Sequence, residues 1–256
     1  MIGIIGGTGF YNVDLFGESK KMNIHTEYGD VDMLKGSYQG KDIVFLPRHG
    51  FKHDRLAYEI THQANIDAFR QLGVKRILTT VAAGGISERC KAGDFVLLDQ
   101  FVNWHTTHYT FGNMSLDMTE PYCSELRGLF IQEAKKLGYP LHETGNYFSF
   151  DGPRYETAAE IRAFKMLGAD VVGMTNAPEA TLAREAGICY SAVVIVTNKA
   201  AGLSSDEPDL KAHGNMVKKN SEKLQKLICA VAAAIPERRH CRCQEWYDRA
   251  AAARSK

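Results

Sequence analysis

The chain alternates short apolar runs with longer segments of helical period. The apolar runs are rich in β-branched and aliphatic residues, as is typical of buried strands, and they lie at Ile2–Ile5, Asp42–Leu46, Arg76–Thr80, Asp94–Leu98, Asp170–Gly173 and Ser191–Val196. Helical patterns occur between or after these runs, at Thr61–Leu72, Ser124–Leu137, Ala158–Leu167, Pro178–Ala186 and Leu210–Ala234. Buried strands connected by helices predict an α/β fold with a central mixed, mostly parallel β-sheet flanked by helices.

The pattern also predicts the domain organisation. No internal repeat, low-complexity linker or block of like charges divides the 256 residues, so we expect a single domain over residues 1–235. Residues 236–256 would then form a C-terminal tail, which contains a Cys-x-Cys sequence.

Charge and hydropathy narrow the class of partner. The chain has 31 basic and 30 acidic residues, and this balance gives no reason to expect a nucleic-acid partner. No apolar run approaches the roughly 18–20 residues that a membrane span needs, so no membrane partner is expected. The first residues, Met1–Gly7, lead directly into a strand and a glycine turn without a basic segment or cleavage site. We therefore expect a cytoplasmic protein.

The six cysteines do not have the density of a secreted disulfide scaffold. Cys90, Cys123, Cys189 and Cys229 stand singly in mixed or apolar stretches, and we interpret them as buried, inert thiols. The Cys241-Arg242-Cys243 sequence leaves three interpretations open: a metal site, a local redox pair or disulfide, and a mobile tail with two thiols. A metal site would need two further ligands, and the tail itself supplies at best His240.

Small and polar residues follow four of the predicted strands, where ligands gather in folds of this class. Gly6-Gly7-Thr8-Gly9 offers a close backbone approach and a hydroxyl donor for an anion. Pro47-Arg48-His49-Gly50 supplies a guanidinium fork and an imidazole, which suit phosphate oxygens. The segment 79–85 forms a floor of small residues, and Thr197-Asn198 adds an amide. These residues favour a pocket that binds a phosphate.

A second group of residues suits a planar ring. Tyr155 offers an aromatic face, Glu156 accepts hydrogen bonds only, and the amide of Asn198 both donates and accepts. A 6-oxopurine such as hypoxanthine or guanine, which presents N–H donors and a carbonyl oxygen, fits this combination, whereas adenine does not. Taken singly, Tyr155 also fits a core position, and Glu156 fits the first turn of a helix.

Two rival functions start from the same residues. Gly3-x-x-Gly6-Gly7-x-Gly9 after a strand is also typical of a dinucleotide-binding turn, with Glu27 placed to contact a ribose, and would indicate an NAD-dependent oxidoreductase. However, no clean second strand ends near Glu27, and the chain has no Tyr-x-x-x-Lys pair for hydride transfer. A non-catalytic binding module would leave Arg48, His49 and Glu156 without a chemical role.

Taken in order, these motifs resemble the trimeric purine nucleoside phosphorylase and methylthioadenosine phosphorylase family. The resemblance covers roughly residues 1–235, and it rests on the segments 2–9, 47–50, 82–85 and 152–154, on Met174-Thr175 with Pro178-Glu179, and on Thr197-Asn198. It implies a single-domain α/β fold, a homotrimer or homohexamer, and metal-free phosphorolysis of a nucleoside. Inorganic phosphate would be the co-substrate, and no cofactor is expected.

The resemblance also implies roles for particular residues. It assigns catalysis to Asn198, Glu156 and His49. The implied phosphate site comprises Thr8, Arg48, His49, Thr80, Ala82 and Thr175. The implied nucleoside site comprises Ala82, Ala83, Gly84, Tyr155, Glu156, Met174, Thr175, Asn198 and His213.

The resemblance further suggests which nucleoside is bound. The methylthioadenosine branch has an Asp where this chain has Asn198, so Asn198 and Glu156 match the 6-oxopurine branch and imply inosine and guanosine as substrates. His213 falls approximately where the hydroxyl branch uses a histidine to contact the 5′ oxygen. An apolar pocket there would instead favour methylthioinosine, and methylthioadenosine remains a further alternative. The segment 104–109 departs from the Arg-containing pattern of the methylthioadenosine branch, which leaves roles for Thr107 and His108 open.

Overall fold

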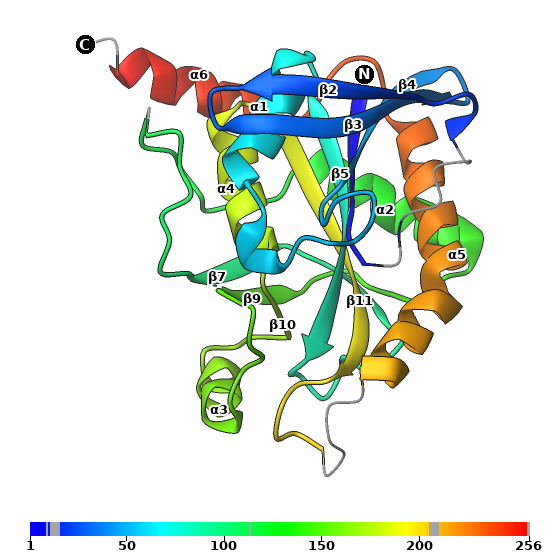
Figure 1. Ribbon diagram of the computed structural model, residues 1–256, viewed down its shortest axis with the longest axis vertical. Coiled ribbons are helices and arrows are strands. Elements are labelled where there is room, and N and C mark those ends of the chain that lie inside the picture. The colour runs from blue at the N-terminus through cyan, green and yellow to red at the C-terminus, as the bar shows by residue number, and fades with distance from the viewer. Residues whose placement is uncertain (9, 11–15, 113, 205–209, 255–256) are drawn as a thin grey trace.

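The computed structural model describes residues 1–8, 10, 16–112, 114–204 and 210–254, and Figure 1 shows it as a ribbon. The strands are β1 (Ile2–Gly6), β2 (Lys20–Thr26), β3 (Gly29–Tyr38), β4 (Lys41–Pro47), β5 (Arg76–Gly85), β6 (Phe95–Leu97), β7 (Gln100–Trp104), β8 (Leu141–His142), β9 (Asn146–Phe150), β10 (Val171–Gly173) and β11 (Cys189–Lys199). The helices are the 3₁₀ turn η2 (Ala57–Glu59), α1 (His62–Gln71), α2 (Ser124–Leu137), α3 (Ala158–Met166), α4 (Asn176–Glu185), α5 (Leu210–Ala234) and α6 (Cys243–Arg254).

The strands form one mixed sheet, as the sequence predicts. Its main path runs β2-β3-β4-β1-β5-β10-β9-β7, and β11 joins β5 on its other side and continues through β6 to β8. Six of the strand pairings within the described residues are parallel and four are antiparallel. Strand β5 pairs with β1 along its first half and with β10 at its end. Strand β5 therefore changes its neighbouring strand along its length, in the region where the small residues 79–85 lie.

Helices cover both faces of this sheet, and the alternation of side chains along the strands explains why. Ile5, Val44 and Ile77 belong to the core cluster that includes residues of α1 and α4. The neighbouring residues Ile4, Phe45 and Leu78 belong to a second cluster that includes residues of α2 and α5. Successive strand side chains point to opposite faces, so strands that are apolar throughout need a helical layer on each side. Figure 1 shows α1 and α4 on one side and α2 and α5 on the other.

The main strands and helices predicted from the sequence are present, but β2, β3, β7, β8 and β9 are not among those predictions. The β2–β3 hairpin has mostly exposed residues along β2, so it lacks the continuous apolar run that marks a buried strand. Strand β9 is buried, yet its sequence Asn146–Phe150 includes polar residues and it lies between two loops. Within the described residues, no helix has the combination of length and apolar character needed to cross a bilayer.

The C-terminal residues pack against the domain. Helix α6 begins at Cys243, which is buried in the same core cluster as α2 and α5. The Arg184 guanidinium of α4 lies over the Trp246 ring of α6, 4.3 Å from its centre. Cys123 and Cys189 are buried free thiols, as expected, although they stand far apart in the sequence. They lie together with Cys241 and Cys243, because the segment before α6 returns to the start of β11.

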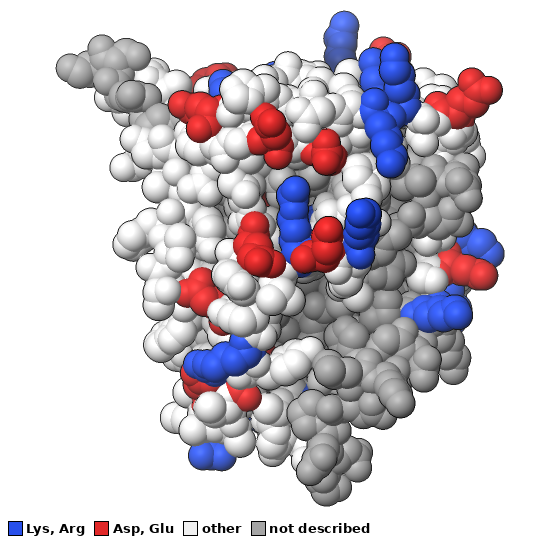
Figure 2. All heavy atoms as spheres, in the orientation of Figure 1, with Lys and Arg blue, Asp and Glu red and all other residues white. Residues whose placement is uncertain are grey.

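Acidic and basic side chains are intermixed on the face of the molecule shown in Figure 2. In Figure 2, basic and acidic side chains alternate over the part of the surface that the structure describes, and neither sign forms a broad field there. This arrangement agrees with the near balance of the 31 basic and 30 acidic residues.

Candidate active site

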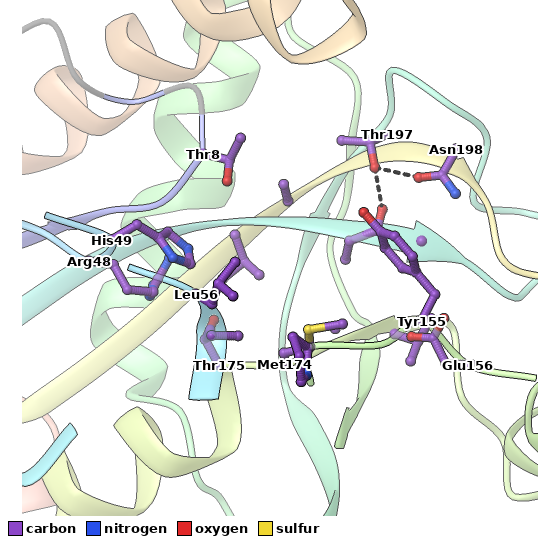
Figure 3. A pocket seen from close by; sticks show the side chains of 18 of the residues that line it. Thr8, Arg48, His49, Leu56, Tyr155, Glu156, Met174, Thr175, Thr197 and Asn198 are labelled. Carbon is purple, nitrogen blue, oxygen red and sulfur yellow. Dashed lines mark hydrogen bonds between the residues drawn. The ribbon is translucent and has the colours of Figure 1, made fainter. Parts of the chain in front are cut away.

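A cavity of about 290 Å³ opens where β5 and β11 end and where the loops after β1, β4 and β9 converge. Of the implied residues whose side chains the structure describes, all but Thr80 line it, namely Thr8, Arg48, His49, Ala82, Ala83, Gly84, Tyr155, Glu156, Met174, Thr175 and Asn198. Figure 3 shows that Thr8, Arg48 and His49 lie at one end of the cavity, and that Tyr155, Glu156 and Asn198 lie at the other. The fold therefore brings the expected anion-binding and ring-binding residues into one space.

Arg48 is fixed by a buried ion pair with Glu179 of α4. Its Nε donates to Glu179 Oε1 over 2.5 Å, and its Nη2 donates to Glu179 Oε2 over 2.9 Å. Both side chains are 1% exposed. Burial by itself would lower the pKa of Arg48, but the charge of Glu179 and its hydrogen bonds outweigh burial and raise it. Burial would likewise raise the pKa of Glu179, and the neighbouring guanidinium holds it below its ordinary value. Both groups are therefore ionised.

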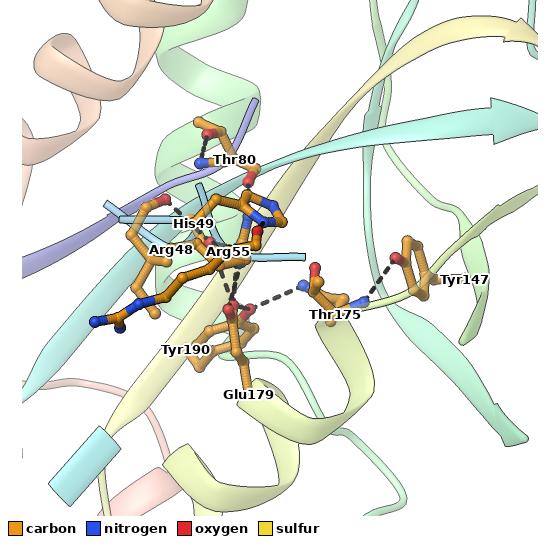
Figure 4. Close-up of polar contacts among 12 residues, drawn as sticks. Arg48, His49, Arg55, Thr80, Tyr147, Thr175, Glu179 and Tyr190 are labelled. Atoms are coloured by element: carbon orange, nitrogen blue, oxygen red, sulfur yellow. Dashed lines mark hydrogen bonds and ion pairs between the residues drawn. The ribbon is translucent and has the colours of Figure 1, made fainter. Parts of the chain in front are cut away.

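The other contacts of Arg48 leave it little freedom to bind a ligand. Nη2 also donates to Thr79 Oγ1 over 2.7 Å, and Nη1 donates to the Thr80 carbonyl over 2.9 Å. A guanidinium has five N–H bonds, so one N–H, on Nη1, remains for an anion. Figure 4 shows this network around Glu179. Because Glu179 balances the charge of Arg48, this arginine offers an anion an oriented N–H dipole rather than an unpaired positive charge.

The glycine turn after β1 packs directly against this network. A Cβ atom at Gly7 would lie 2.4 Å from Arg48 Nη1 and 2.6 Å from the Thr80 carbonyl oxygen, so only glycine fits. The Gly7 amide donates to Thr80 Oγ1 over 3.1 Å. Thr80 is 1% exposed and stands behind the cavity wall. Through this hydrogen bond from Gly7, Thr80 stabilises the turn in which Thr8 lies. Gly9, the last residue of this motif, lies outside the described residues.

His49 is held in one tautomer when neutral. Its Nδ1 lies 2.9 Å from the Arg55 carbonyl oxygen, and a carbonyl only accepts, so Nδ1 carries the proton. Burial, followed by the charge of Arg48, lowers the pKa of His49 to about 4. His49 is therefore neutral at physiological pH, and its Nε2 has a free lone pair. That nitrogen can accept a proton or a hydrogen bond from a protonated phosphate oxygen.

The ring end of the cavity begins with Tyr155 and Glu156, on the loop before α3. Tyr155 is 54% exposed and lies at the cavity margin, so it is not the core residue that its size alone would allow. Glu156 is half-buried, and desolvation raises the pKa of its carboxyl group. Helix α3 has a capping box in which Thr157 Oγ1 accepts from the Glu160 amide and Glu160 accepts from the Thr157 amide. This cap fixes the start of α3, directly after Glu156.

Asn198 reaches the cavity because β11 is irregular at this point. The register between β11 and β5 shifts between Val196 and Asn198, so Thr197 is an extra residue in the ladder. A bulge of this kind re-aims the side chains beside it. Thr197 Oγ1 lies 3.2 Å from the Ala83 carbonyl oxygen and 2.7 Å from Asn198 Oδ1. Asn198 Nδ2 donates to the Lys199 carbonyl over 2.7 Å, which leaves its second N–H for a ligand.

Met174 forms the floor between the two ends (Figure 3). It follows β10 directly, and Thr175 is the N-cap residue of α4. Glycine at position 152 makes room for the Met174 side chain, since a Cβ there would lie 2.6 Å from the sulfur. An apolar floor beneath polar ends suits a sugar that links a ring to an anion.

The structure adds residues that the sequence did not single out. Leu56 and Ala57 of the η2 region line the cavity, as do Val172 and Thr197. Thr197 stands beside Asn198 in a motif that the sequence does mark, whereas Leu56 and Ala57 occur in no motif. His213 lies within α5, but its side chain is outside the described residues. Its expected contact with a 5′ oxygen therefore remains a prediction.

Comparison with known proteins gives consistent results. A family model described as "Phosphorylase superfamily" matches residues 1–233. A protein of Thermococcus kodakarensis named "Probable 6-oxopurine nucleoside phosphorylase" is 44% identical, with 95% of this chain and 96% of the relative covered. A Pyrococcus furiosus protein named "S-methyl-5'-thioadenosine phosphorylase" is 40% identical, with 95% and 96% covered. The solved structure of a Schistosoma mansoni methylthioadenosine phosphorylase in complex with adenine superimposes with a TM-score of 0.89 at 28% identity, covering 97% of this chain and 96% of that one.

Proposed function

Because the chain belongs to the phosphorylase superfamily, we propose that it cleaves 6-oxopurine nucleosides, inosine and guanosine, with inorganic phosphate. The products would be the free purine base and ribose 1-phosphate, and no cofactor besides the phosphate co-substrate would take part. The observation that carries this proposal is the pairing of Glu156 with Asn198 at one end of a cavity whose other end holds Thr8, Arg48 and His49.

Base selection would rest on the hydrogen-bonding types of two side chains. An ionised Glu156 accepts a hydrogen bond from N1–H of a 6-oxopurine, and the free N–H of Asn198 donates to N7 or O6. Adenine has a lone pair at N1, which would face the carboxylate of Glu156. A buried mismatch of this type leaves polar groups unpaired and costs on the order of 1–3 kcal/mol.

Phosphate would bind between Thr8, His49 and Thr175. The neutral His49 Nε2 accepts a hydrogen bond from the P–OH group of a monoprotonated phosphate, while the remaining Arg48 N–H and the hydroxyl groups donate to its oxygens. The ion pair with Glu179 holds Arg48 in place before the ligand arrives, so little reorganisation is needed on binding.

Breaking the C1′–N9 bond develops positive charge on the sugar and negative charge on the base. The phosphate, held on the opposite face of the sugar, stabilises the first charge and then forms the new bond to C1′. The amide of Asn198 stabilises the second charge as the base leaves. The bonding electrons of C1′–N9 stay with the purine, and the proton that the monoprotonated phosphate loses when it bonds to C1′ ends on the purine, so the reaction balances without an intermediate bound to the protein.

A comparison of substrates tests the proposal. We expect inosine and guanosine to be cleaved only with phosphate present, with kcat/KM values at least about 10²-fold above that of adenosine. Release of hypoxanthine and of ribose 1-phosphate would be measured in the same reactions. Equal values for inosine and adenosine would contradict the base assignment. Turnover that needs NAD, or no turnover of any nucleoside, would contradict phosphorolysis altogether.

A second candidate is cleavage of 5′-methylthio nucleosides, methylthioinosine or methylthioadenosine. Leu56, Ala57 and Met174 give the cavity an apolar portion that could receive a methylthio group. The His213→Val variant separates the candidates: if His213 donates to a 5′ hydroxyl, the variant loses activity with inosine but not with methylthioinosine. Equal losses with both substrates would contradict that role for His213.

The proposal includes the assembly and the location of the protein. We propose a homotrimer or homohexamer, in line with the resemblance of the sequence motifs, and a cytoplasmic location. Sedimentation equilibrium of the purified protein would give the subunit number, and a monomer at micromolar concentration would contradict it.

A further inference from the structure

Four cysteines from three distant parts of the chain meet at the opposite end of β11 from the cavity. They are Cys123, Cys189, Cys241 and Cys243, and their sulfur atoms all lie within 4.8 Å of one another. The Sγ atoms of Cys189 and Cys241 are 3.3 Å apart, and all four side chains are free thiols. Among the residues that the structure describes, this is the one group of cysteine, histidine and acidic side chains arranged to hold a metal ion.

Each of these cysteines is held by a defined element. Cys123 is the N-cap residue of α2, and its amide donates to the Tyr190 carbonyl over 2.8 Å. Cys189 is the first residue of β11, and its amide donates to the Lys75 carbonyl over 3.0 Å. Cys241 precedes α6 and Cys243 begins it. Cys123, Cys189 and Cys243 are at most 4% exposed, and Cys241 is half-buried. These elements therefore place the four sulfur atoms close together in a region that is largely inaccessible to solvent.

We propose that these four cysteines bind one zinc ion as thiolates, in a closed structural site. Zinc in structural sites is tetrahedral with Zn–S bonds of about 2.3 Å, which places the sulfur atoms about 3.8 Å apart. The sulfur atoms of Cys189 and Cys241 are 3.3 Å apart, and no pair is more than 4.8 Å apart, so the expected 3.8 Å lies within the observed range. Four protein ligands leave no open position for water or substrate, so the ion has a structural and not a catalytic role.

The surroundings suit the negative charge of such a site. One zinc ion with four thiolates has a net charge of −2, which needs compensation where water is excluded. Arg239 Nη1 lies 3.9 Å from Cys189 Sγ. The same nitrogen donates to the Gly187 carbonyl over 3.0 Å, and Nη2 donates to Gln244, so the guanidinium is fixed beside the sulfur atoms.

The site is remote from the proposed reaction. Cys189 begins β11 and Asn198 lies near its end, and nine residues of strand at about 3.3 Å each separate them by roughly 30 Å. The ion would connect α2, β11 and the segment before α6. Cys123 and Cys189 are 66 residues apart along the chain, and Cys189 and Cys241 are 52 residues apart. Its effect would be to fasten the C-terminal helix to the domain.

Metal analysis of the full-length protein tests this directly. We expect about one zinc ion per chain after purification under reducing conditions without added metal, retained through dialysis against a weak chelator. Replacement by Co²⁺ should give the visible absorption bands of tetrahedral thiolate coordination. Apoprotein that takes up neither ion would overturn the proposal, and so would iron in place of zinc.

Two variants locate the ion. Cys241→Ser removes the least buried ligand and should lower the zinc content at least tenfold, with a loss of thermal midpoint on the order of 5–10 °C. Cys90→Ser replaces a buried cysteine outside the group and should retain the full zinc content. Equal zinc content in the two variants would overturn the assignment. Both variants should keep phosphate-dependent cleavage at low temperature if the site is structural, and this readout is independent of the metal content.

Oxidation gives a different result in the same experiments. If the four cysteines formed disulfides in the protein as purified from cells, the mass of the denatured chain would fall by two hydrogen atoms for each bond. Thiols would then be missing from a titration in denaturant, and zinc would be absent. That outcome would overturn the proposal, whereas a full set of thiols that react only after zinc is removed would support it.

Discussion

In the proposed function, Asn198 and Glu156 divide base recognition between an amide and a carboxylate. The amide has one N–H engaged by the Lys199 carbonyl and one N–H free, and the carboxylate can only accept. Their complementarity to a 6-oxopurine therefore depends on single atoms rather than on the size of the cavity. Exchanging the –NH₂ group for an oxygen at position 198 leaves the side-chain shape almost unchanged, so it alters hydrogen bonding, both to a ligand and to the Lys199 carbonyl, with little change in volume.

Asn198→Asp should reverse part of the base preference. The substitution removes the donor to N7 and O6, so we expect kcat/KM for inosine to fall about 10²-fold. Activity with adenosine should fall much less or rise, since the introduced carboxylate can accept a hydrogen bond from the 6-amino group. Steady-state kinetics with both nucleosides measure the change. Asn198→Ala is the control, because it removes both functions and should reduce activity with both substrates. An Asp variant with the full preference for inosine would show that Asn198 does not contact the base.

At the scale of elements, the start of α3 determines where Tyr155 and Glu156 lie. This helix buries only Ile161 and Phe164, so local interactions contribute much of its stability. The capping box of Thr157 and Glu160 is one such interaction, and the Arg154 guanidinium donates to both Glu160 carboxylate oxygens, over 2.8 and 2.7 Å. These contacts, together with the carbonyl of Tyr155 that accepts from Arg154, anchor the loop on both sides of Glu156.

Thr157→Ala should therefore weaken nucleoside binding from outside the cavity. Loss of an N-cap costs about 1 kcal/mol, which corresponds to a roughly fivefold higher KM for inosine if the loop must order on binding. The KM for phosphate should change little, because the phosphate end lies on other elements. Thr157→Ser keeps the capping hydroxyl and is the matched control. Identical KM values for the Ala and Ser variants would contradict a role for the cap in positioning Glu156.

The bulge in β11 is a second element-scale feature with consequences for the site. A regular strand would place Thr197 and Asn198 on alternate faces in register with β5, whereas the shift after Val196 lets both side chains line the cavity. The apolar run that ends at Val196 predicts a strand, but nothing in its composition marks the extra residue. The sequence thus indicates which residue types lie at the strand end, and the pairing with β5 decides how they point.

At the scale of the whole molecule, buried polar groups connect the cavity to the core. Arg48 and Glu179 are 131 residues apart, and Tyr190 of β11 donates to Glu179 Oε2 over 2.7 Å. His62, at the start of α1, is 1% exposed and is packed edge-on against Tyr109. Desolvation, with smaller contributions from nearby charges, lowers the pKa of His62 to about 4. The His62 imidazole therefore makes the free energy of unfolding depend on pH.

The sign of that linkage follows from the lowered pKa. The native state keeps His62 neutral down to about pH 4, whereas an unfolded histidine takes up a proton near pH 6.5. The contribution of His62 to stability is therefore complete above pH 6.5 and is lost as the pH falls toward 4, and about 2 kcal/mol of it is lost between pH 7 and pH 5.

His62→Phe should reduce the loss of stability in acid by about that amount, about 2 kcal/mol between pH 7 and pH 5. Urea denaturation of the wild type and the variant at both values measures the difference, which separates His62 from the carboxylates that also titrate. His108→Gln is the control, because it deletes an exposed imidazole. The same acid sensitivity in the wild type and in His62→Phe would contradict the linkage.

The sequence by itself determined the alternation of strands and helices, because apolar periodicity acts between residues that are neighbours along the chain. It also determined the residue types at the strand ends, including Asn198, and before the helix that follows Glu156. Only the tertiary structure decided that Thr80 stands behind the wall, that Arg48 is balanced by Glu179, and that Cys123 and Cys189 meet the Cys-x-Cys sequence. These relations join residues 52 to 131 positions apart, as for Cys189 with Cys241 and Arg48 with Glu179, so they depend on strand pairing and helix packing that no local pattern contains.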